Sequence, residues 1–263
     1  MSLAEYTDHN NLARMVKTLI KSCNRCELGQ GSNRVVYGGT TWRPKLILLG
    51  EAPGRQEDLM GEPFVGAAGK LLDDILAMVG LTRNHVMIAN TVCCRPPGNR
   101  DPEWSEIQAC RVNREAQLYL GKTWVGVSLG RIALGTLLED PGKSIGAYKG
   151  KPFWRGDMVW VPTYHPAYGL RTKTAISEIA SHIKLALDIY DGKREAPYPP
   201  TRDYKMEEGV LIIDHEAVKV PAKILEAGWP VFTREEWARV SYTPEAKKAA
   251  IQLKLELDAT VIG

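Results

Sequence analysis

Residues 45–54 read KLILLGEAPG, a short apolar run that ends at Gly50 and is followed at once by polar and turn-forming residues. A run of this kind is typical of a strand that is buried on both faces of a parallel sheet. Three similar runs follow along the chain, and each is followed by a segment with the apolar spacing of a helix. The alternation predicts an α/β fold, a three-layer sandwich in which helices cover both faces of a four-stranded parallel sheet. The expected strands are Lys45–Leu49, Val86–Ala89, Trp124–Val127 and Met158–Val161, and the expected helices are Lys70–Val79, Ser105–Leu120 with Ser105 as its N-cap, Gly130–Leu138 and Thr174–Tyr190.

The two ends of the chain differ from this central part. A helix is expected over Asn11–Lys21 and an extended piece over Arg34–Tyr37. After Tyr190, prolines among charged residues indicate a linker over Asp191–Tyr204. We therefore expect a main domain over residues 1–192 and a linker with a small α+β extension over residues 193–263. Within the extension we expect a strand at Val210–Ile213, a helix opened by the capping box Thr233–Glu236 and running to Val240, and a helix from Thr243 to Leu257.

The composition is that of an ordinary globular protein, with 263 residues, 44% hydrophobic and 25% charged. The net charge of +3 permits a polyanionic partner without demanding one. Apolar runs such as Leu46–Leu49 are too short to span a bilayer, and the N-terminus lacks the apolar stretch of a secretory signal. We expect a cytoplasmic monomer that does not interact with membranes.

Polar side chains follow the predicted strands where each one ends. They are Glu51, Asn90, Ser128 and His165. Because ligands of parallel sheets bind outside the carboxyl ends of the strands, a carboxylate, an amide and an imidazole should converge on one crevice. The segment GEPFVGAAG at 61–69 leads into a helix, and its three glycines suit close backbone approach to a phosphate or a base. The alternatives are tight helix–sheet packing for the glycines, and a core position instead of a stacking surface for Phe64.

Five cysteines lie in the first part of the chain: Cys23, Cys26, Cys93, Cys94 and Cys110. Four thiolates suit either zinc or a four-iron cluster, and the wide, uneven spacing after the Cys-x-x-Cys pair favours a cluster. Cys93 is the odd thiol, with replacement of Cys94 as a ligand left as an alternative, and five unconnected thiols as another. The rigid, basic loop between the last two cysteines carries Arg95 and Arg100, which suit contact with a phosphate backbone or else belong to a solvated turn.

Together these motifs resemble the family 4, iron–sulfur branch of the uracil-DNA glycosylases. The resemblance rests on GEAPG at 50–54 with ED at 57–58 and GEPFVGAAG at 61–69, on Asn90 with CRPPGNR at 94–100, and on HPA at 165–167. It covers roughly residues 12–190, and the tail matches no part of the family. The resemblance implies a 4Fe-4S cluster held by Cys23, Cys26, Cys94 and Cys110, with a structural role, and leaves Cys93 as the spare thiol.

The resemblance also implies an activity, the hydrolysis of the glycosidic bond of a flipped-out uracil in DNA. Phe64 would stack on the base, Asn90 would read its polar edge, and His165 would stabilise the negative charge that develops on it. Glu51 would orient the attacking water, and Glu57 would crowd the methyl group of thymine. The residues expected to contact the substrate are Ala52, Gly54, Glu57, Phe64, Asn90 and Ser128, and those expected to contact DNA are Arg95, Arg100, Leu170 and Arg171.

One motif departs from the family pattern. Family members usually carry a Leu-Leu-Arg wedge after His-Pro-Ala, whereas this chain reads YGLR at 168–171. Gly169 removes one apolar side chain, so the wedge is expected at Leu170 or Tyr168, or is weaker. The leading hypothesis is a monofunctional uracil glycosylase of base excision repair, because no lysine occupies the predicted pocket as a nucleophile. The alternatives are a glycosylase for another modified base, and a non-catalytic DNA-binding accessory whose tail docks a protein partner.

Overall fold

The computed structural model describes residues 13–14, 16–39, 43–156 and 158–197, and the backbone of the strands at 204–207, 210–213 and 216–219. The chain divides into two compact units, Met1–Pro199 and Pro200–Gly263. The division falls inside the proline-containing segment 191–204. Each unit is described by itself below.

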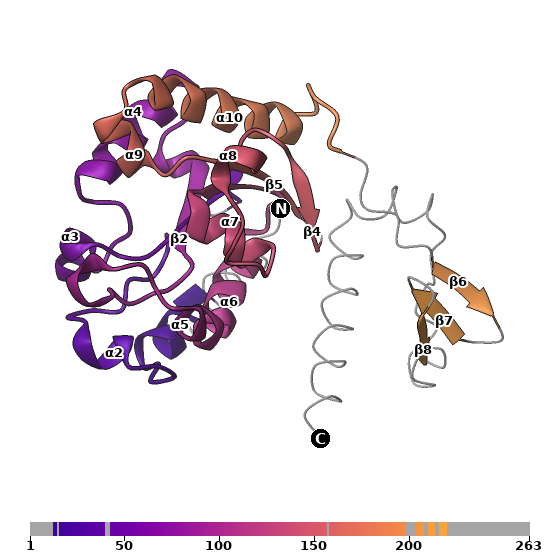
Figure 1. Cartoon of the computed structure of the whole chain (residues 1–263), viewed down its shortest axis with the longest axis horizontal. Helices are drawn as coiled ribbons and strands as arrows, with labels where there is room; N and C mark the ends of the chain where they lie inside the picture. The colour runs from indigo at the N-terminus through magenta and orange to yellow at the C-terminus, as the bar shows by residue number, and fades with distance from the viewer. Residues whose placement is uncertain are drawn as a thin grey trace. The chain divides into compact units, whose positions relative to one another are not determined.

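The first unit is built on a five-stranded sheet with the order β2-β1-β3-β5-β4 (Figure 1). The four predicted strands are all present and parallel to one another, which confirms the α/β fold: β1 (Leu46–Gly50), β2 (Val86–Asn90), β3 (Val125–Leu129) and β5 (Met158–Thr163). The fifth strand, β4 (Phe153–Arg155), was not predicted. It pairs antiparallel with β5 at the edge of the sheet, across a short turn at Gly156. The sequence did not reveal this strand because three residues are too few to show the hydrophobic pattern of a strand.

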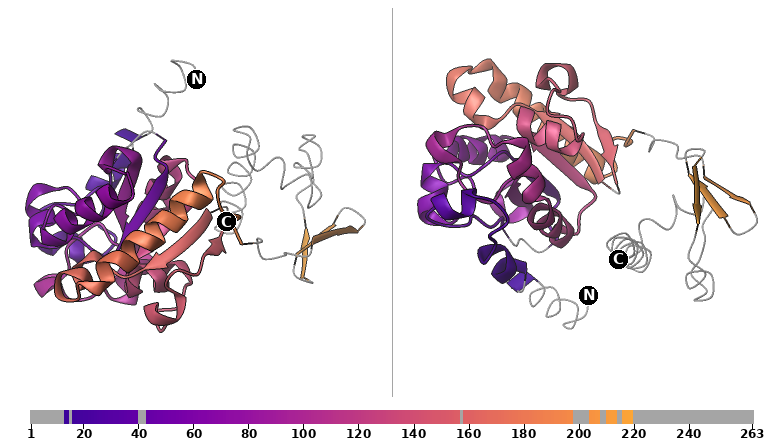
Figure 2. Two further views of the ribbon diagram at one scale, coloured as in Figure 1. Left: turned by 90° about the horizontal axis from the view of Figure 1, so that it is seen from above. Right: turned by 60° about the horizontal axis from the view of Figure 1, so that its bottom comes forward.

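Helices cover both faces of this sheet (Figures 1 and 2). The first strand shows how: Leu46 and Leu48 belong to the core cluster that includes α4 and α10 residues, whereas Ile47 and Leu49 pack with residues of α6 and α7. All four side chains are fully buried, as expected for a strand covered on both faces. One face carries α4 (Ala67–Met78), α9 (Pro166–Arg171) and α10 (Thr174–Tyr190), and the other carries α6 (Arg111–Gly121) and α7 (Arg131–Leu137).

One prediction of local structure was wrong. The helix predicted over Ser105–Leu120 is divided at Cys110 into α5 (Trp104–Ala109) and α6, and its N-cap is Glu103 rather than Ser105. Glu103 and Glu106 form a reciprocal capping box there, which satisfies backbone donors at the start of the helix. The segment Arg34–Tyr37, predicted to be extended, lies outside the helices and strands, and its Val36 N–H donates to the Cys93 carbonyl at 2.7 Å. Residues 16–21 of the predicted first helix are helical.

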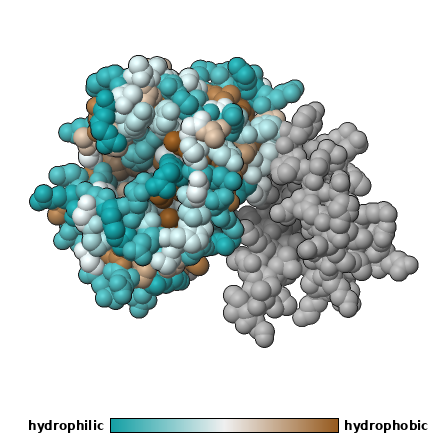
Figure 3. All heavy atoms as spheres, in the orientation of Figure 1, coloured by the Kyte–Doolittle hydropathy of each residue, from teal (hydrophilic) through white to brown (hydrophobic). Residues whose placement is uncertain are grey.

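Several short helical turns lie in the connections and have no periodic signal because they are so short. They are α2 (Leu28–Gly31), α3 (Arg55–Met60), α8 (Ile145–Tyr148), η1 (Arg83–His85) and η2 (Pro97–Asn99). No described helix is long and apolar enough to cross a bilayer. In the view of Figure 3, apolar atoms on the described surface are scattered among hydrophilic ones rather than gathered in one patch.

The second unit contains a three-stranded antiparallel sheet of β6 (Tyr204–Glu207), β7 (Val210–Ile213) and β8 (Glu216–Lys219). The strand predicted at Val210–Ile213 coincides with β7. The two helices predicted at residues 233–240 and 243–257 lie outside the described residues.

Candidate active site

The carboxyl ends of β1 and β2 and the loop before α4 meet around Gly50. Gly50 pairs in register with Asn90, and a Cβ atom on Gly50 would lie 2.4 Å from Asn90 Oδ1 and 2.6 Å from Phe64 Cε2. The Phe64 ring lies with its centroid 5.5 Å from that of His165, which follows β5. Any side chain at position 50 would displace the amide or the ring, so glycine is required for the convergence that the sequence predicted.

The ring of Phe64 is held by an unusual backbone. Phe64 is 5% exposed and has a φ of 54°, in the left-handed region that a bulky residue rarely adopts. The Arg83 guanidinium donates hydrogen bonds to the carbonyls of Pro63 and Phe64. A Cβ atom on Gly69 would lie 1.7 Å from the Phe64 carbonyl oxygen. Gly69 therefore allows α4 to pack closely against the backbone of Phe64.

Glu57 and His165 flank the same loop. Glu57 Oε1 accepts hydrogen bonds from the backbone N–H groups of Val65 at 2.9 Å and Gly66 at 2.8 Å. Burial lowers the pKa of His165 to about 4, although the charge of Glu57 acts in the opposite direction. The imidazole is therefore neutral at neutral pH. Its Nδ1 accepts from the Ala167 N–H at 3.2 Å, so the proton lies on Nε2, which is left as a donor.

Asn90 presents an unused acceptor. Its side chain is 5% exposed, and its Oδ1 has no hydrogen-bond partner among the described residues. Leaving a buried polar atom unpaired costs about 1–3 kcal/mol, so such atoms are rare unless a ligand supplies the partner. Asn90 continues the sheet face of Ile88, the same face on which Phe64 packs. The amide is thus directed to the side of the sheet where Phe64 lies.

Glu51 is a carboxylate in a setting that disfavours its charge. Burial, with a smaller contribution from the charge of Asp101, raises the pKa of Glu51 to about 7, and the charge of Arg131 acts in the opposite direction. Asp101 and Arg131 form an ion pair, with Oδ2 and an Nη atom 2.6 Å apart. The Glu51 carbonyl accepts from both the N–H and the hydroxyl of Thr91, at 3.1 and 2.5 Å. Thr91, the residue that follows β2, therefore fixes the backbone of Glu51 by these two hydrogen bonds.

Comparison with known protein families agrees with this geometry. The sequence profile described as the uracil DNA glycosylase superfamily matches residues 37–186. The chain belongs to this superfamily. The resemblance predicted from the motifs is thereby confirmed.

Several relatives of this chain are named uracil-DNA glycosylases. A type-4 uracil-DNA glycosylase of Archaeoglobus fulgidus is 40% identical over 172 residues, which cover 63% of this chain and 86% of that protein. A type-4 uracil-DNA glycosylase of Thermotoga maritima is 38% identical over 164 residues, 62% of this chain and 85% of that protein. A type-5 uracil-DNA glycosylase of Thermus thermophilus is 34% identical over 127 residues, 43% of this chain and 56% of that protein.

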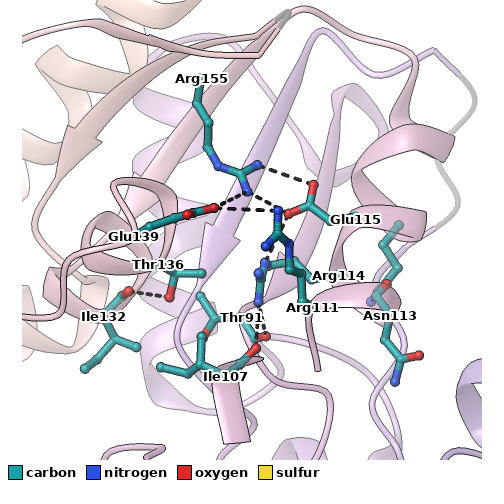
Figure 4. A network of polar contacts seen from close by, with 11 residues as sticks. Thr91, Ile107, Arg111, Asn113, Arg114, Glu115, Ile132, Thr136, Glu139 and Arg155 are labelled. Atoms are coloured by element: carbon teal, nitrogen blue, oxygen red, sulfur yellow. Dashed lines mark hydrogen bonds and ion pairs between the residues drawn. The ribbon is translucent and has the colours of Figure 1, made fainter. Parts of the chain in front are cut away.

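In this superfamily member, the sequence patterns did not reveal a buried arginine that supports the backbone of the site. Arg114 on α6 is only 1% exposed, and its guanidinium donates to the carbonyls of Thr91 and Ile107, each at 3.2 Å (Figure 4). It ties the end of β2, and through Thr91 the backbone of Glu51, to α5. A buried arginine on an amphipathic helix has the same sequence signal as a surface one such as Arg111, so the pattern could not reveal it.

Some predicted site residues lie apart from this convergence. Ser128 pairs in register with Leu49 and shares its face of the sheet, toward α7, so it lies on the face opposite to Asn90. The Arg100 guanidinium is bound by Glu106 through two hydrogen bonds of 2.9 and 2.6 Å. Arg95 donates to Asn99 Oδ1 at 2.6 Å. The other predicted contacts are placed in two groups: half-buried Ala52 and Gly54 after β1, and exposed Leu170 and Arg171 on α9.

All five cysteines of the superfamily member line one pocket: Cys23, Cys26, Cys93, Cys94 and Cys110. Among the residues that the structure describes, no three metal-binding side chains are arranged to hold a single metal ion. Cys93 is the most buried of the five, at 2% exposed. Its sulfur accepts from Gln117 Nε2 at 3.3 Å, and its backbone N–H points to the sulfur of Cys110 at 3.4 Å.

Proposed function

We propose that this superfamily member is a uracil-DNA glycosylase of base excision repair, which hydrolyses the bond between uracil and its deoxyribose and leaves an abasic site. The observation that carries the proposal is the convergence of an aromatic ring, an unpaired amide oxygen and a neutral imidazole donor at the strand ends. Relatives named type-4 uracil-DNA glycosylases, 38–40% identical, support it.

The proposed roles follow from the geometry. Because a base inside a duplex cannot be reached, the nucleotide is flipped into the pocket, where it stacks on Phe64. The amide of Asn90 pairs with the polar edge of the base. As the glycosidic bond breaks, its electron pair passes to the base, and the Nε2–H of His165 donates a hydrogen bond to the oxygen that gains negative charge. Glu57, fixed by two backbone N–H groups, stands where a 5-methyl group would be crowded.

Glu51 is proposed to act on the sugar side of the same bond. The ionised carboxylate orients a water molecule toward the anomeric carbon and stabilises the positive charge that the sugar develops. The water supplies the hydroxyl of the product sugar, and its proton leaves through the carboxylate. A pKa of about 7 places Glu51 close to the range in which a group can both hold and release a proton near neutrality.

We propose a monofunctional enzyme, because the groups at the strand ends are a carboxylate, an amide and an imidazole rather than an amine nucleophile. Lys149, whose ammonium lies over the ring of Tyr164 beside His165, is paired with Glu178. The test is an oligonucleotide with one uracil. Release of the base, with strand breakage only after alkali, is the expected result, and breakage without alkali would contradict it. A panel with hypoxanthine, xanthine and hydroxymethyluracil tests the alternative base, and tight DNA binding without release of any base would favour the accessory protein.

The ion pair beside Glu51 gives a pH prediction. Below its pKa, Glu51 is protonated and inactive in the proposed role, so uracil release should fall as the pH drops through about 7. Arg131→Gln removes the charge that lowers the pKa of Glu51, and should move this acid limb to higher pH. Asp101→Asn removes a charge that raises it, and should move the limb to lower pH. The pH dependence of kcat/KM measures both shifts, and shifts of the same sign in the two variants would contradict the role of Glu51.

We further propose that the cysteine pocket holds a 4Fe-4S cluster through Cys23, Cys26, Cys94 and Cys110. The donor set fits because four thiolates from separate segments line one pocket. The arrangement also fits a cluster better than it fits a single metal ion. Each thiolate of such a cluster binds a different iron atom, so the four sulfurs need not converge on one point. Among the described residues they form no single-ion site. When bound, the cluster supplies cross-linking of these segments and no step of the hydrolysis.

The cluster proposal predicts colour and metal content. Protein purified without oxygen should be brown, absorb at about 400 nm and contain iron. Cys94→Ser and Cys110→Ser should lose the absorbance and unfold at lower temperature, whereas the matched control Cys93→Ser should keep the absorbance. Iron analysis, the absorbance spectrum and thermal unfolding measure these effects. Zinc in place of iron, or loss of the absorbance in the Cys93 variant alone, would contradict the ligand assignment.

A further inference from the structure

Two tyrosine rings pack against each other at an angle beside His165. The ring centroids of Tyr164 and Tyr168 lie 4.8 Å apart with an interplanar angle of 40°. Tyr164 precedes His165 directly, and the Tyr168 N–H donates to the His165 carbonyl at 2.9 Å. The two rings are therefore attached to the same turn that positions the imidazole. Tyr164 is half-buried, whereas Tyr168 is 38% exposed, so one ring of the pair is partly covered by the protein and the other lies at the surface.

The inner ring is held by its neighbours. The Lys149 ammonium lies 4.6 Å from the centroid of the Tyr164 ring, within the range of a cation–π interaction. The same ammonium pairs with Glu178 of α10. Tyr164 is thus fixed between the end of α8 and the turn before α9, and Tyr168 rests on a supported surface. An ordered aromatic ring loses little conformational entropy when it binds.

The neighbouring glycine explains why the exposed side chain is Tyr168. Gly169 is buried, and a Cβ atom there would lie 3.1 Å from Leu71 of α4 and 3.2 Å from Ile176 of α10. Position 169 therefore faces the two helices on which α9 packs, and it cannot carry a wedge in this chain. The large apolar side chains that α9 exposes are Tyr168 and Leu170.

We propose that Tyr168, supported by Tyr164, is a stacking platform for the base next to the flipped nucleotide on the strand that carries the uracil. The inference rests on the proposed function, since the flipped base at Phe64 and His165 leaves its neighbour in the strand near this turn. Aromatic rings bind single-stranded bases by stacking, at about 1–3 kcal/mol per base and with little dependence on sequence. An aliphatic wedge, in contrast, acts only on a duplex, where it fills the space that the flipped base leaves.

The test measures binding to single-stranded and duplex oligonucleotides that carry 2′-fluoro-deoxyuridine, which the enzyme cannot cleave. Tyr168→Ala should weaken binding to both by about 5- to 100-fold. Tyr168→Phe should bind like the wild type, because the ring is kept. Tyr119→Ala is the matched control: Tyr119 is 42% exposed on α6, which covers the other face of the sheet. It should leave binding and uracil release unchanged, and thermal unfolding checks that each variant is folded.

A fluorescent base separates stacking from a general loss of contact. With 2-aminopurine on either side of the 2′-fluoro-deoxyuridine, binding of the wild type and Tyr168→Phe should quench one of the two positions, and Tyr168→Ala should not. A loss confined to the duplex would assign Tyr168 to a wedge and overturn the proposal, as would unchanged binding by Tyr168→Ala. Failure of the wild type to release uracil would instead refute the proposed function, so the two failures are distinguishable.

Discussion

Replacing Glu51 by glutamine should lower the rate of uracil release by about 10²- to 10⁴-fold, the range that a positioned acid–base group contributes. Glutamine has nearly the same shape but neither holds the negative charge that stabilises the sugar cation nor accepts the proton of the attacking water. Binding to an oligonucleotide with uracil should change little, because the role proposed for Glu51 is in the transition state. Single-turnover release, measured with enzyme in excess, reports the chemical step directly, and a filter or anisotropy assay reports binding.

The stability of the same variant separates a chemical defect from a folding defect. Burial raises the pKa of Glu51 from its ordinary value to about 7, so the folded state favours the protonated carboxyl. Ionisation of Glu51 therefore opposes folding. The cost is absent at pH values below the unfolded pKa, grows as the pH rises from there to about 7, and is fully present above that. Glu51→Gln should consequently unfold at a higher temperature than the wild type at pH 8 and at the same temperature at pH 4. Lower stability at pH 8 together with lost activity would indicate a structural role instead.

The sequence was sufficient for the sheet and for grouping polar residues at the ends of its strands. The four buried strands are apolar runs bounded by turns, and crossover connections that contain helices make them parallel. Parallel strands bring their carboxyl ends to one edge, which is why Glu51, Asn90 and His165 could be grouped before any contact was known. The same reasoning does not tell on which face of the sheet a residue lies, and Ser128 lies on the face opposite to Asn90. The alternation of polar and apolar residues that would reveal the face is absent in a strand that is buried on both sides.

Other features depend on tertiary contacts that carry no periodic signal. The left-handed backbone of Phe64 exists because Arg83 holds two carbonyls of its loop and Gly69 leaves room for it. Burial of Arg114 depends on the carbonyl of Thr91, 23 residues away in the sequence, and on that of Ile107 in the preceding helix. The break at Cys110 falls between two segments that share one helical pattern, so the pattern predicted a single helix.

Replacing His165 by alanine should lower uracil release by about 10²- to 10³-fold, the usual cost of removing one donor to a developing oxyanion. The Nε2–H is the group that would be lost, since Nδ1 is already engaged as an acceptor from the Ala167 N–H. His165→Gln keeps an N–H donor on a side chain of similar reach and should recover part of the rate, which a purely structural role would not require. Phe64, whose ring lies 5.5 Å from the imidazole, makes thermal unfolding a necessary control.

The pH profile of the His165 variants decides which group gives the acid limb. Burial holds the pKa of His165 at about 4, so the imidazole is neutral throughout the range from about pH 5 to 9 and its titration should not appear in that range. The limb near pH 7 belongs to Glu51 and should therefore remain in His165→Ala, at a lower absolute rate. Loss of that limb in His165→Ala would show that the histidine titrates near neutrality. The base would then be stabilised by an imidazolium, and the neutral-donor mechanism would be wrong.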